Sequence, residues 1–398
     1  MKLLYSLPHP TDRLETGRAG HLIRAAALVQ ALRAAGHEVR CHEAAAAPAL
    51  AGAAQGYRRL LKRLAAGPLT APATLLLRDA GRALLGRGAA GRLAAIAADW
   101  RPDAILETHV ELAMAGAVAA RRTGVPLVLD DVSPIGEEAA HYGGGSVARA
   151  RAAFRRVCAA AGLLVAVTPQ IRALLQAEGI AAERILLLEN GVDPALFHPG
   201  IDGGACRAAL GLPAAAVVLV YVGSFQPFHG VPLLLESLAA LPADGLRLLL
   251  VGDGPAAAEC RRRAATLGLG DRVLFTGRVP YEAVAATIAA ADIAVVPASN
   301  DYGDSMKLRD YMAVGRPVLA PDQPTIARVV EHERTGLLFA RDDPAALAAA
   351  IARLAGDPAL RRRLGRAAAA EAVRHSWASR AEALAGAIRG LRPAAAQR

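Results

Sequence analysis

Residues 291–321 have the sequence "ADIAVVPASNDYGDSMKLRDYMAVGRPVLAP", and this stretch indicates the class of fold. An apolar run over 293–299 predicts a strand, and a helix is expected to begin near Ser305. The segment "RPVLAP" (316–321) predicts the next strand. Strand, helix and strand in this order form the repeating unit of a parallel sheet covered by helices. The stretch therefore predicts an α/β fold.

The same alternation continues on both sides of this stretch. Further strands are predicted at "KLLYSLP" (2–8), "HEVRCHE" (37–43), "DAILETH" (103–109), "VPLVLDDV" (125–132), "GLLVAVT" (162–168), "RILLLEN" (184–190), "VVLVYVG" (217–223), "LRLLLVG" (246–252), "RVLFTG" (272–277) and "GLLFA" (336–340). Helical patterns lie between them, over 20–35, 111–122, 169–178, 230–240, 255–267, 281–290 and 324–332, and a helical tail follows Pro344. Two Rossmann-like sheets are the direct inference.

A chain of 398 residues exceeds what one hydrophobic core usually serves, so two domains are expected. The segment from 190 to 213 is rich in Gly, Pro and Asp, as a linker is. We predict an N-terminal domain over 1–190 and a C-terminal domain over 191–375. The final segment, 376–398, is expected to return to the N-terminal domain as a helix that begins at Trp377. Ligands of open α/β sheets bind beyond the carboxyl ends of the strands, so the two sheets are expected to face a central cleft.

The composition describes an ordered globular protein, with 54% hydrophobic and 21% charged residues. The four cysteines form no CxxC pair, which argues against a zinc site or a disulfide framework and favours a reducing cytosol. The N-terminus is typical of an edge strand rather than a signal peptide, and no apolar stretch approaches the ~20 residues that span a bilayer. A soluble, cytoplasmic protein is expected.

The formal net charge is +10, and much of the excess lies in residues 57–92, where eight arginines and lysines accompany one acid. Leucines alternate with these arginines at helical spacing, a pattern typical of a helix on an anionic membrane surface. The alternative is an ordinary solvated arginine face. The segment has almost no aromatic residues for base stacking, so no nucleic-acid partner is expected.

Three glycine-containing loops follow strands of the second half, over 222–230, 251–255 and 301–308. Glycine lets backbone N–H groups approach a ligand closely, and a helix start favours a phosphate. The third loop is therefore interpreted as a diphosphate cradle made by the amides of 304–307 and the ammonium of Lys307. Asp310 lies about one turn later, where an acid can accept two ribose hydroxyls. The expected ligand is a nucleoside diphosphate.

Motifs along nearly the whole chain resemble those of retaining glycosyltransferases of family 4, which have the GT-B fold. "LENGVDPALFHP" is similar to the hinge segment of that family. "YVGSF…HG", "LLLVGDGP", "VLFTGRVP", "ADIAVVPAS", "KLRDYMAVGRPVLAP" and "RTGLLF" follow in the family's order. The "GS…HG" and "MKL…YMA" loops look like those of one branch. In the first half, "GHLIRAAALVQALRAAGHEV" is similar to the family's opening helix.

The resemblance implies a sugar-nucleotide donor in the second domain, a glycan or lipid-linked acceptor in the first, and retention of the anomeric configuration. It implies no cofactor and no catalytic metal. Asp310 then corresponds to the acid on the donor ribose. The other donor-binding residues implied by the resemblance or the loop pattern are Ser224, His229, Arg278, Val279, Ser305, Met306, Lys307 and Leu308.

The chain departs from the family pattern at several of these positions. Ser224 and His229 replace an arginine and a lysine on the diphosphate, and we hypothesise that Lys307 and a protonated His229 compensate. Tyr302 stands where many members have a glutamate near the transferred sugar, and Asp310 stands where glutamate is usual. Asp301 and Asp304 flank this position and are candidates for contacting that sugar; the alternative for Asp304 is that it caps the helix at 305.

The first-half loops supply candidates for the acceptor side. Gly17 and Gly20 flank Arg18 in a loop expected to face the cleft, and they do not form the GxGxxG pattern of a nicotinamide site. Asp131 and His109 follow neighbouring strands and are candidates for orienting the acceptor hydroxyl. The alternative for each is a cap or a hydrogen-bonded turn.

Two alternatives to a transferase stay open at this point. A sugar-nucleotide epimerase of the same fold would bind the same donor but needs no acceptor channel. A catalytically silent sugar-nucleotide-binding protein is the other, because of Tyr302 and Asp310.

Overall fold

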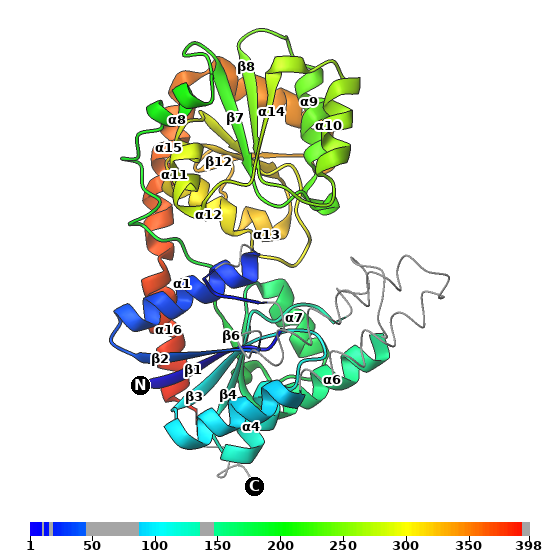
Figure 1. The fold of residues 1–398 in the computed structure, drawn as a ribbon. Helices are drawn as coiled ribbons and strands as arrows, with labels where there is room; N and C mark the ends of the chain where they lie inside the picture. The colour runs from blue at the N-terminus through cyan, green and yellow to red at the C-terminus, as the bar shows by residue number, and fades with distance from the viewer. Residues whose placement is uncertain (10–11, 16–18, 45–86, 136–146, 392–398) are drawn as a thin grey trace. The chain divides into compact units, whose positions relative to one another are not determined.

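The computed structural model describes residues 1–398 except 10–11, 16–18, 45–86, 136–146 and 392–398 (Figure 1). The Cα packing divides the chain into two units. Unit 1 contains Met1–Glu189 and Trp377–Arg398, and unit 2 contains Asn190–Ser376. The chain therefore passes between the units twice, at 189–190 and at 376–377. Both positions lie within one residue of the boundaries expected from the sequence.

Unit 1 is built on a six-stranded parallel sheet with the strand order β2-β1-β3-β4-β5-β6. The strands are Lys2–Leu7 (β1), Glu38–Glu43 (β2), Ala104–Thr108 (β3), Leu127–Asp130 (β4), Ala161–Ala166 (β5) and Ile185–Leu187 (β6). Its helices include Gly20–Ala34 (α1), Ala115–Thr123 (α4), Val147–Ala160 (α6), Pro169–Ala177 (α7) and Trp377–Arg389 (α16). Every residue of β3 and β4 is buried, as in sheets covered on both faces.

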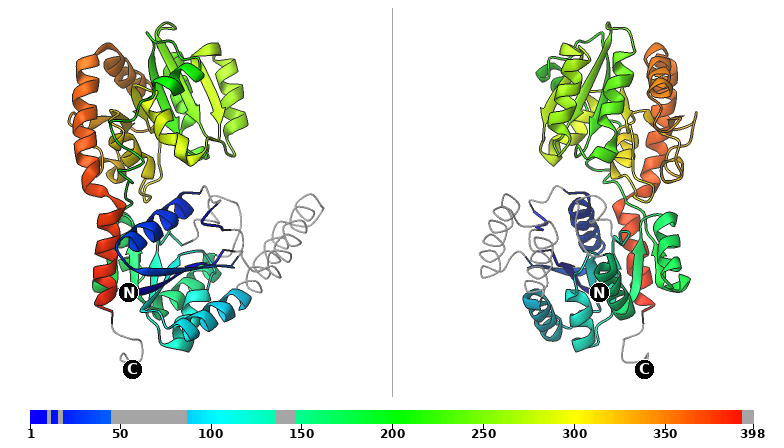
Figure 2. Two further views of the ribbon diagram at one scale, coloured as in Figure 1. Left: turned by 60° about the vertical axis from the view of Figure 1, so that its left-hand side comes forward. Right: turned by 90° about the vertical axis from the view of Figure 1, so that its right-hand side faces the viewer.

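Unit 2 contains a second six-stranded parallel sheet, with the order β12-β11-β10-β7-β8-β9 (Figure 2). Its strands are Val217–Val222 (β7), Leu246–Val251 (β8), Val273–Gly277 (β9), Ile293–Val295 (β10), Val318–Pro321 (β11) and Gly336–Phe339 (β12). Its helices include Gly204–Ala209 (α8), Val231–Ala239 (α9), Ala257–Thr266 (α10), Tyr281–Ala289 (α11), Met306–Ala313 (α12), Pro324–Ala327 (α13), Pro344–Gly356 (α14) and Pro358–Ala372 (α15). The expected α/β fold with two parallel sheets is confirmed.

The cores follow from the alternation of side chains along the strands. In β7, Val218 and Val220 pack with α11 and α12 on one face, whereas Leu219 and Tyr221 pack with α9 and α14 on the other. In unit 1, α16 contributes Ala381, Leu384, Ala385 and Ile388 to the core that also holds α1. The last helix of the chain is therefore part of the first unit's core.

One helix begins later than the sequence pattern predicts. The pattern over 111–122 predicts a helix from Glu111, but α4 begins at Ala115. Leu112 has a φ of 67°, in the left-handed region, which a right-handed helix cannot contain. This conformation ends the preceding turn and delays the helix by about one turn.

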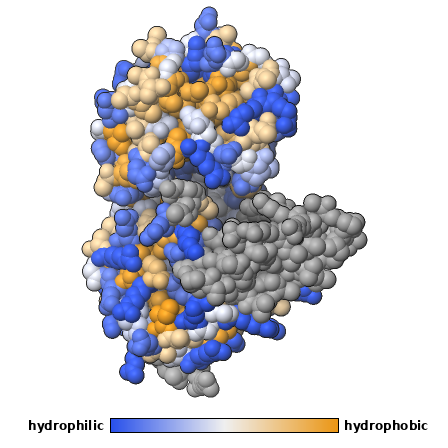
Figure 3. All heavy atoms as spheres, viewed as in Figure 1, coloured by the Kyte–Doolittle hydropathy of each residue, from blue (hydrophilic) through white to orange (hydrophobic). Residues whose placement is uncertain are grey.

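Hydrophilic and hydrophobic residues are interspersed over the face shown in Figure 3. Among the described residues, no helix combines the length and the apolarity needed to cross a bilayer.

Candidate functional site

The strand order of unit 2 reverses between β7 and β10. From β7 the chain continues to β8 and β9 on one side, while β10, β11 and β12 follow on the other. In open parallel sheets the loops that leave the two central strands separate at this point and open a ligand-binding crevice. The loops concerned are 223–230, after β7, and 296–305, after β10.

The loops after β7, β8 and β9 are hydrogen-bonded to one another. The Gly223 N–H donates to the Val251 carbonyl (3.0 Å), and the Gly252 N–H donates to the Gly277 carbonyl (2.8 Å). A Cβ at Gly252 would lie 1.9 Å from the Gly223 carbonyl oxygen, and the φ of Gly252 is 124°. Glycine is therefore required there, both for the backbone conformation and for the close approach of the loops.

Helix α12 presents an open N-terminus beside these loops. Its N-cap is Ser305, whose side chain makes no capping hydrogen bond in the described structure. The helix is anchored by Leu308, Tyr311 and Met312 in the core of unit 2. The Val222 N–H, at the end of β7, donates to the Tyr311 hydroxyl oxygen (2.7 Å). This bond holds the second turn of α12 against the end of β7.

Lys307, in the first turn of α12, points to that same loop. Its Nζ donates to the Tyr221 hydroxyl (3.3 Å) and lies 4.4 Å from the centroid of the Tyr221 ring. A Cβ at Gly223 would be only 2.5 Å from this Nζ. Burial lowers the pKa of Lys307 to about 7. No carboxylate pairs with Lys307 among the described residues, so a negatively charged ligand would supply the missing counter-charge.

Asp310 lies one turn further along α12, on the same side as Lys307. Burial raises the pKa of Asp310 to about 7, although the charge of Arg309 opposes the shift. In the described part of the chain no side chain donates a hydrogen bond to this carboxylate. Two half-buried ionisable groups of opposite kind therefore lie within one turn of each other, and neither has an ion-pair partner among the described residues. They suit a ligand that carries both an anion and hydroxyl groups.

Ser224 and His229 form a turn around the Ser224 carbonyl. That oxygen accepts hydrogen bonds from the Tyr221 hydroxyl (2.9 Å) and from His229 Nδ1. Burial, together with the charge of Lys307, lowers the pKa of His229 to about 3. The imidazole is therefore neutral at pH 7 in this structure. The hypothesis that protonated His229 supplies a second charge is wrong for this arrangement.

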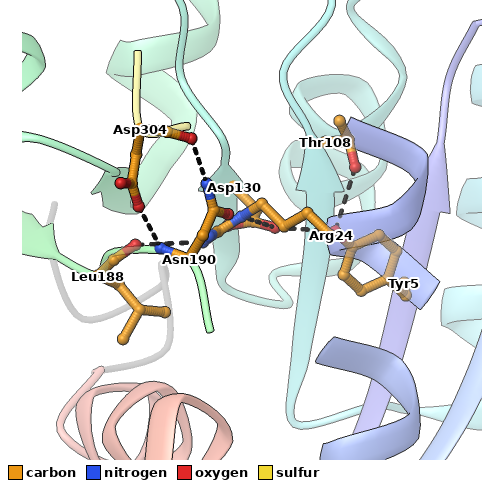
Figure 4. A network of polar contacts seen from close by, with 7 residues as sticks. All are labelled: Tyr5, Arg24, Thr108, Asp130, Leu188, Asn190 and Asp304. Carbon is orange, nitrogen blue, oxygen red and sulfur yellow. Dashed lines mark hydrogen bonds and ion pairs between the residues drawn. The ribbon is translucent and has the colours of Figure 1, made fainter. Parts of the chain in front are cut away.

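The side chain of Asp304 does not face the loops that Lys307 contacts. One carboxylate oxygen accepts from the Asn190 N–H (2.7 Å) (Figure 4). The other accepts from Arg309 Nη1 (2.6 Å). The side chain of Asp304 is fully buried. The alternative that Asp304 caps α12 is wrong, because Ser305 is the N-cap and the Asp304 carboxylate faces Arg309 and Asn190 instead. The geometry also leaves no exposed oxygen of Asp304 for a sugar.

The remaining donor candidates line the same edge of the sheet. Arg278 and Val279 follow β9; the arginine is exposed, and the valine packs against the core of unit 2. Ser305 and Met306 supply backbone at the start of α12, while the Leu308 side chain is buried in the core. Sequence reasoning missed Tyr221 and Tyr311, although a tyrosine within the apolar run "VVLVYVG" was a visible signal.

In unit 1, His109 and Asp131 lie at neighbouring strand ends. The His109 N–H donates to the Asp130 carbonyl (2.8 Å), and the His109 ring lies edge-on to Phe154 with 5.5 Å between the ring centroids. Asp131 has a φ of 53°, a strained value for a residue other than glycine. Backbone strain of this kind is common at functional sites and supports keeping Asp131 as an acceptor-side candidate.

Asp130, the neighbour of Asp131, belongs to a buried network. Its carboxylate accepts from Arg24 Nη2 (2.8 Å) and from the Tyr5 hydroxyl (2.8 Å) (Figure 4). Gly20 is exposed at the first position of α1. Gly17 and Arg18 lie outside the described residues, as do residues 57–86 of the basic segment. No cluster of three or more His, Cys, Asp or Glu with metal-binding geometry occurs in the part of the chain that is described.

Comparison with protein families gives two adjacent matches. A family model described as Glycosyltransferase Family 4 matches residues 20–196, and one described as Glycosyl transferases group 1 matches residues 216–357. Among curated relatives, a D-inositol 3-phosphate glycosyltransferase from Acidothermus cellulolyticus is 34% identical over 71% of this chain and 67% of its own length. An enzyme of the same name from Nocardia farcinica is 35% identical over 58% of this chain. The chain covers only 53% of the Nocardia enzyme.

Solved structures show the same architecture at lower sequence identity. Anabaena HepE, solved in complex with UDP and glucose, superposes with a TM-score of 0.75 over 98% of this chain and all of its own, at 20% identity. Sucrose-phosphate synthase from Thermosynechococcus elongatus has a TM-score of 0.71 over 98% of both chains, at 23% identity. At these sequence identities, the two similarities show the fold and do not define a shared substrate.

Proposed function

Because the chain belongs to glycosyltransferase family 4 and is therefore a transferase, we propose that it moves a hexose from a nucleoside-diphosphate sugar to an acceptor hydroxyl with retention of configuration. The observation that carries the proposal is that Lys307 and Asp310, half-buried on the first turns of α12, have no ion-pair partner among the described residues. The pKa of each group is shifted to about 7 by burial. A nucleoside diphosphate presents an anion and ribose hydroxyls a short distance apart. It would satisfy both groups at once.

The donor residues act mainly through electrostatics. The ammonium of Lys307 and the open N–H groups of α12 stabilise the charge that develops on the leaving diphosphate. Asp310 accepts the ribose hydroxyls and fixes the position of the nucleotide along the helix. Ser224 and the neutral His229 shape the loop beside the diphosphate, and the backbone of Arg278 and Val279 contacts the base. Asp131 and His109 orient the acceptor hydroxyl in unit 1.

Uridine is the base we propose. The support is that HepE, which has this fold, was solved in complex with UDP. No metal is required in the proposed reaction, since Lys307 and helix amides neutralise the diphosphate.

The proposed acceptor is a lipid-linked or surface-polysaccharide glycan intermediate, reached from the cytoplasmic face of the plasma membrane. The support is the density of arginines and leucines over 57–92, which suits an anionic membrane surface. The names of the curated relatives point to a phosphorylated inositol instead, and the assay below includes that acceptor.

The test combines a binding screen with a transfer assay. Thermal shifts with UDP, GDP and ADP identify the base, because a ligand that binds only the folded state raises the melting temperature. The purified protein is then incubated with the radiolabelled sugar nucleotide and either membrane lipid extract or inositol 3-phosphate, with and without EDTA. Label transferred to an acceptor in EDTA supports the proposal. An epimerised donor identifies an epimerase, and binding without chemistry identifies a silent binding protein.

A further inference from the structure

Each unit holds its own end of the connecting chain through a buried arginine–aspartate pair. In unit 1, Arg24 Nη2 lies 2.8 Å from Asp130 and donates a longer bond (3.4 Å) to the Leu188 carbonyl. In unit 2, Asp304 pairs with Arg309 and accepts from the Asn190 N–H at 2.7 Å. Figure 4 shows the contacts of Arg24 with Asp130 and Leu188 and those of Asp304 with Asn190. One residue, Glu189, separates the two points of attachment.

The attachment of Asn190 has two hydrogen bonds. Besides its backbone N–H, its side-chain Nδ2 donates to the main-chain oxygen of Asp304 at 2.8 Å. The Asp304 and Arg309 side chains are 0% and 1% exposed. A buried pair of this kind persists only when its geometry is well satisfied, because an unpaired charge in the interior is strongly unfavourable. Asn190 is therefore held in one orientation relative to residue 304.

The same pair belongs to the structure that carries the donor-binding charges. Asp304 directly precedes the N-cap of α12, and Arg309 lies between Lys307 and Asp310 in sequence. The Arg309 side chain is buried, whereas Lys307 and Asp310 are partly accessible. A shift of the first turn of α12 would therefore move the group that holds Asn190.

The second connection between the units is attached to the first within unit 2. The Val192 N–H donates to the His375 carbonyl at 2.8 Å, and Val192 forms a β-bridge with Ser376. Holding Asn190 therefore also restrains the 3-10 turn Val373–His375 and Ser376, which lead to α16. The mobility of both connections, at 189–190 and 376–377, therefore depends on how Asn190 and Val192 are held.

We propose that Asp304 and Arg309 are positioning residues that join the first turn of α12, which binds the donor, to the hinge, residues 188–193. Donor binding then restrains the hinge. Turnover depends on Asp304 although Asp304 does not touch the substrate. This inference rests on the proposed function, because it takes the donor to lie on Lys307 and Asp310.

The test uses the full chain and UDP as the probe. The informative variant is Asn190→Asp, which keeps the size of the side chain but replaces the donating amide with a carboxylate next to Asp304. Asp304→Asn is the companion variant. Asp202→Asn is the matched control, because Asp202 also accepts a backbone N–H, that of Gly204 at 2.8 Å, on an exposed loop of unit 2.

Hydrogen exchange of peptides spanning 188–193 is measured with and without UDP, together with UDP affinity by titration calorimetry. In the wild type and in Asp202→Asn, UDP is expected to slow exchange in these peptides by about tenfold or more. In Asn190→Asp the peptides should exchange faster without ligand, and UDP should bind within about threefold of wild-type affinity but no longer slow them. Turnover of UDP-glucose with membrane extract should fall by about tenfold or more at an unchanged KM.

The inference and the proposed function are overturned by different results. If UDP slows exchange equally in Asn190→Asp and the wild type, or if turnover is unchanged, the inference is wrong while the proposed function stands. If the wild type does not bind UDP, the uridine donor is wrong. If peptides 188–193 of the unliganded wild type exchange as fast as an unfolded chain, Asn190 is not held and the inference is wrong. Should Asp304→Asn fail to fold, Asn190→Asp still decides, because it leaves the buried ion pair intact.

Discussion

The ammonium of Lys307 lies 3.3 Å from the hydroxyl of Tyr221 and 4.4 Å from the centre of its ring. Tyr221 is fully buried and donates its own hydroxyl proton to the Ser224 carbonyl. The hydroxyl oxygen and the ring face are thus left to hold the cation by hydrogen bonding and by a cation–π contact. The position of the charge is therefore set by a rigid aromatic side chain on β7 rather than by an acid.

Removing this charge should weaken donor binding. Lys307→Met is expected to raise the dissociation constant of UDP-glucose by about tenfold to a hundredfold, since a charge-assisted hydrogen bond contributes about 1.5–3 kcal/mol. Titration calorimetry measures the change. His229→Ala is the comparison and should cost less, because His229 is neutral. Equal losses in the two variants would contradict the role given to Lys307.

The same lysine predicts a pH dependence. Its pKa of about 7 means that it is charged below pH 7 and loses its proton above it. A bound diphosphate favours the charged form, so binding takes up a proton and the affinity for UDP-glucose should fall as the pH rises above 7. UDP-glucose is the suitable ligand because its diphosphate does not titrate in this range. In Lys307→Met the fall above pH 7 should be absent.

Asp310 should act in the opposite sense. Its pKa of about 7 keeps it partly protonated near neutrality, and the carboxylate is the better acceptor for ribose hydroxyls. Affinity should therefore decline as the pH falls below 7, giving a maximum near pH 7 in the wild type. Asp310→Asn should bind UDP and 2′-deoxy-UDP with similar affinity, whereas the wild type should prefer UDP by about tenfold. If Asp310→Asn still prefers UDP to 2′-deoxy-UDP by about tenfold, Asp310 does not bind the ribose hydroxyl.

Gly223 should be intolerant of a side chain. An alanine Cβ would lie 2.5 Å from Lys307 Nζ and 3.0 Å from the Tyr221 hydroxyl. Because the end of a lysine is flexible, Gly223→Ala should displace the ammonium and weaken UDP binding by about tenfold. The φ of Gly223 is 155°, a conformation that favours glycine, so the variant should also have a lower melting temperature. Gly356→Ala is the control, since a Cβ there meets no atom within 4 Å. A variant with wild-type affinity would show that the ammonium need not stay at Tyr221.

A buried acid in unit 1 predicts a stability change away from the donor site. Burial raises the pKa of Glu107 to about 7. The Ser6 hydroxyl (3.0 Å) and the Gly116 N–H (2.8 Å) donate hydrogen bonds to its carboxylate and lower the pKa, but burial has the larger effect. The folded protein therefore binds a proton that the unfolded chain releases near pH 4.5. The free energy of unfolding should fall by about 3 kcal/mol as the pH rises from 4.5 to 7.

Urea unfolding of Glu107→Gln at pH 5 and pH 8 tests this expectation. The variant should lose less stability between the two pH values than the wild type does, because its amide does not titrate. Glu282→Gln, at an exposed position of α11, should behave as the wild type. If Glu107→Gln loses as much stability between pH 5 and pH 8 as the wild type, the pH dependence comes from other groups.

The alternation of apolar strands and helices was enough to predict both sheets, because buried parallel strands need continuous apolar runs. It could not reveal that Asp304 turns away from the loop toward Arg309 and Asn190, since Asn190 lies 114 residues from Asp304 in sequence. The same limit explains why Tyr221 was missed: its role comes from the approach of α12 to β7. The late start of α4 at Ala115 arose from backbone conformation at Leu112, which side-chain periodicity does not report.

The place of α16 in the core of unit 1 has a consequence for biosynthesis. Residues 1–189 emerge from the ribosome long before Ala381, Leu384 and Ile388, which complete their core against α1. Unit 2, whose residues are contiguous from 190 to 376, has all its core side chains available earlier. The first unit to be translated is therefore the last that can finish folding. Loss of the final helix would leave the apolar face of α1 uncovered in the newly made protein.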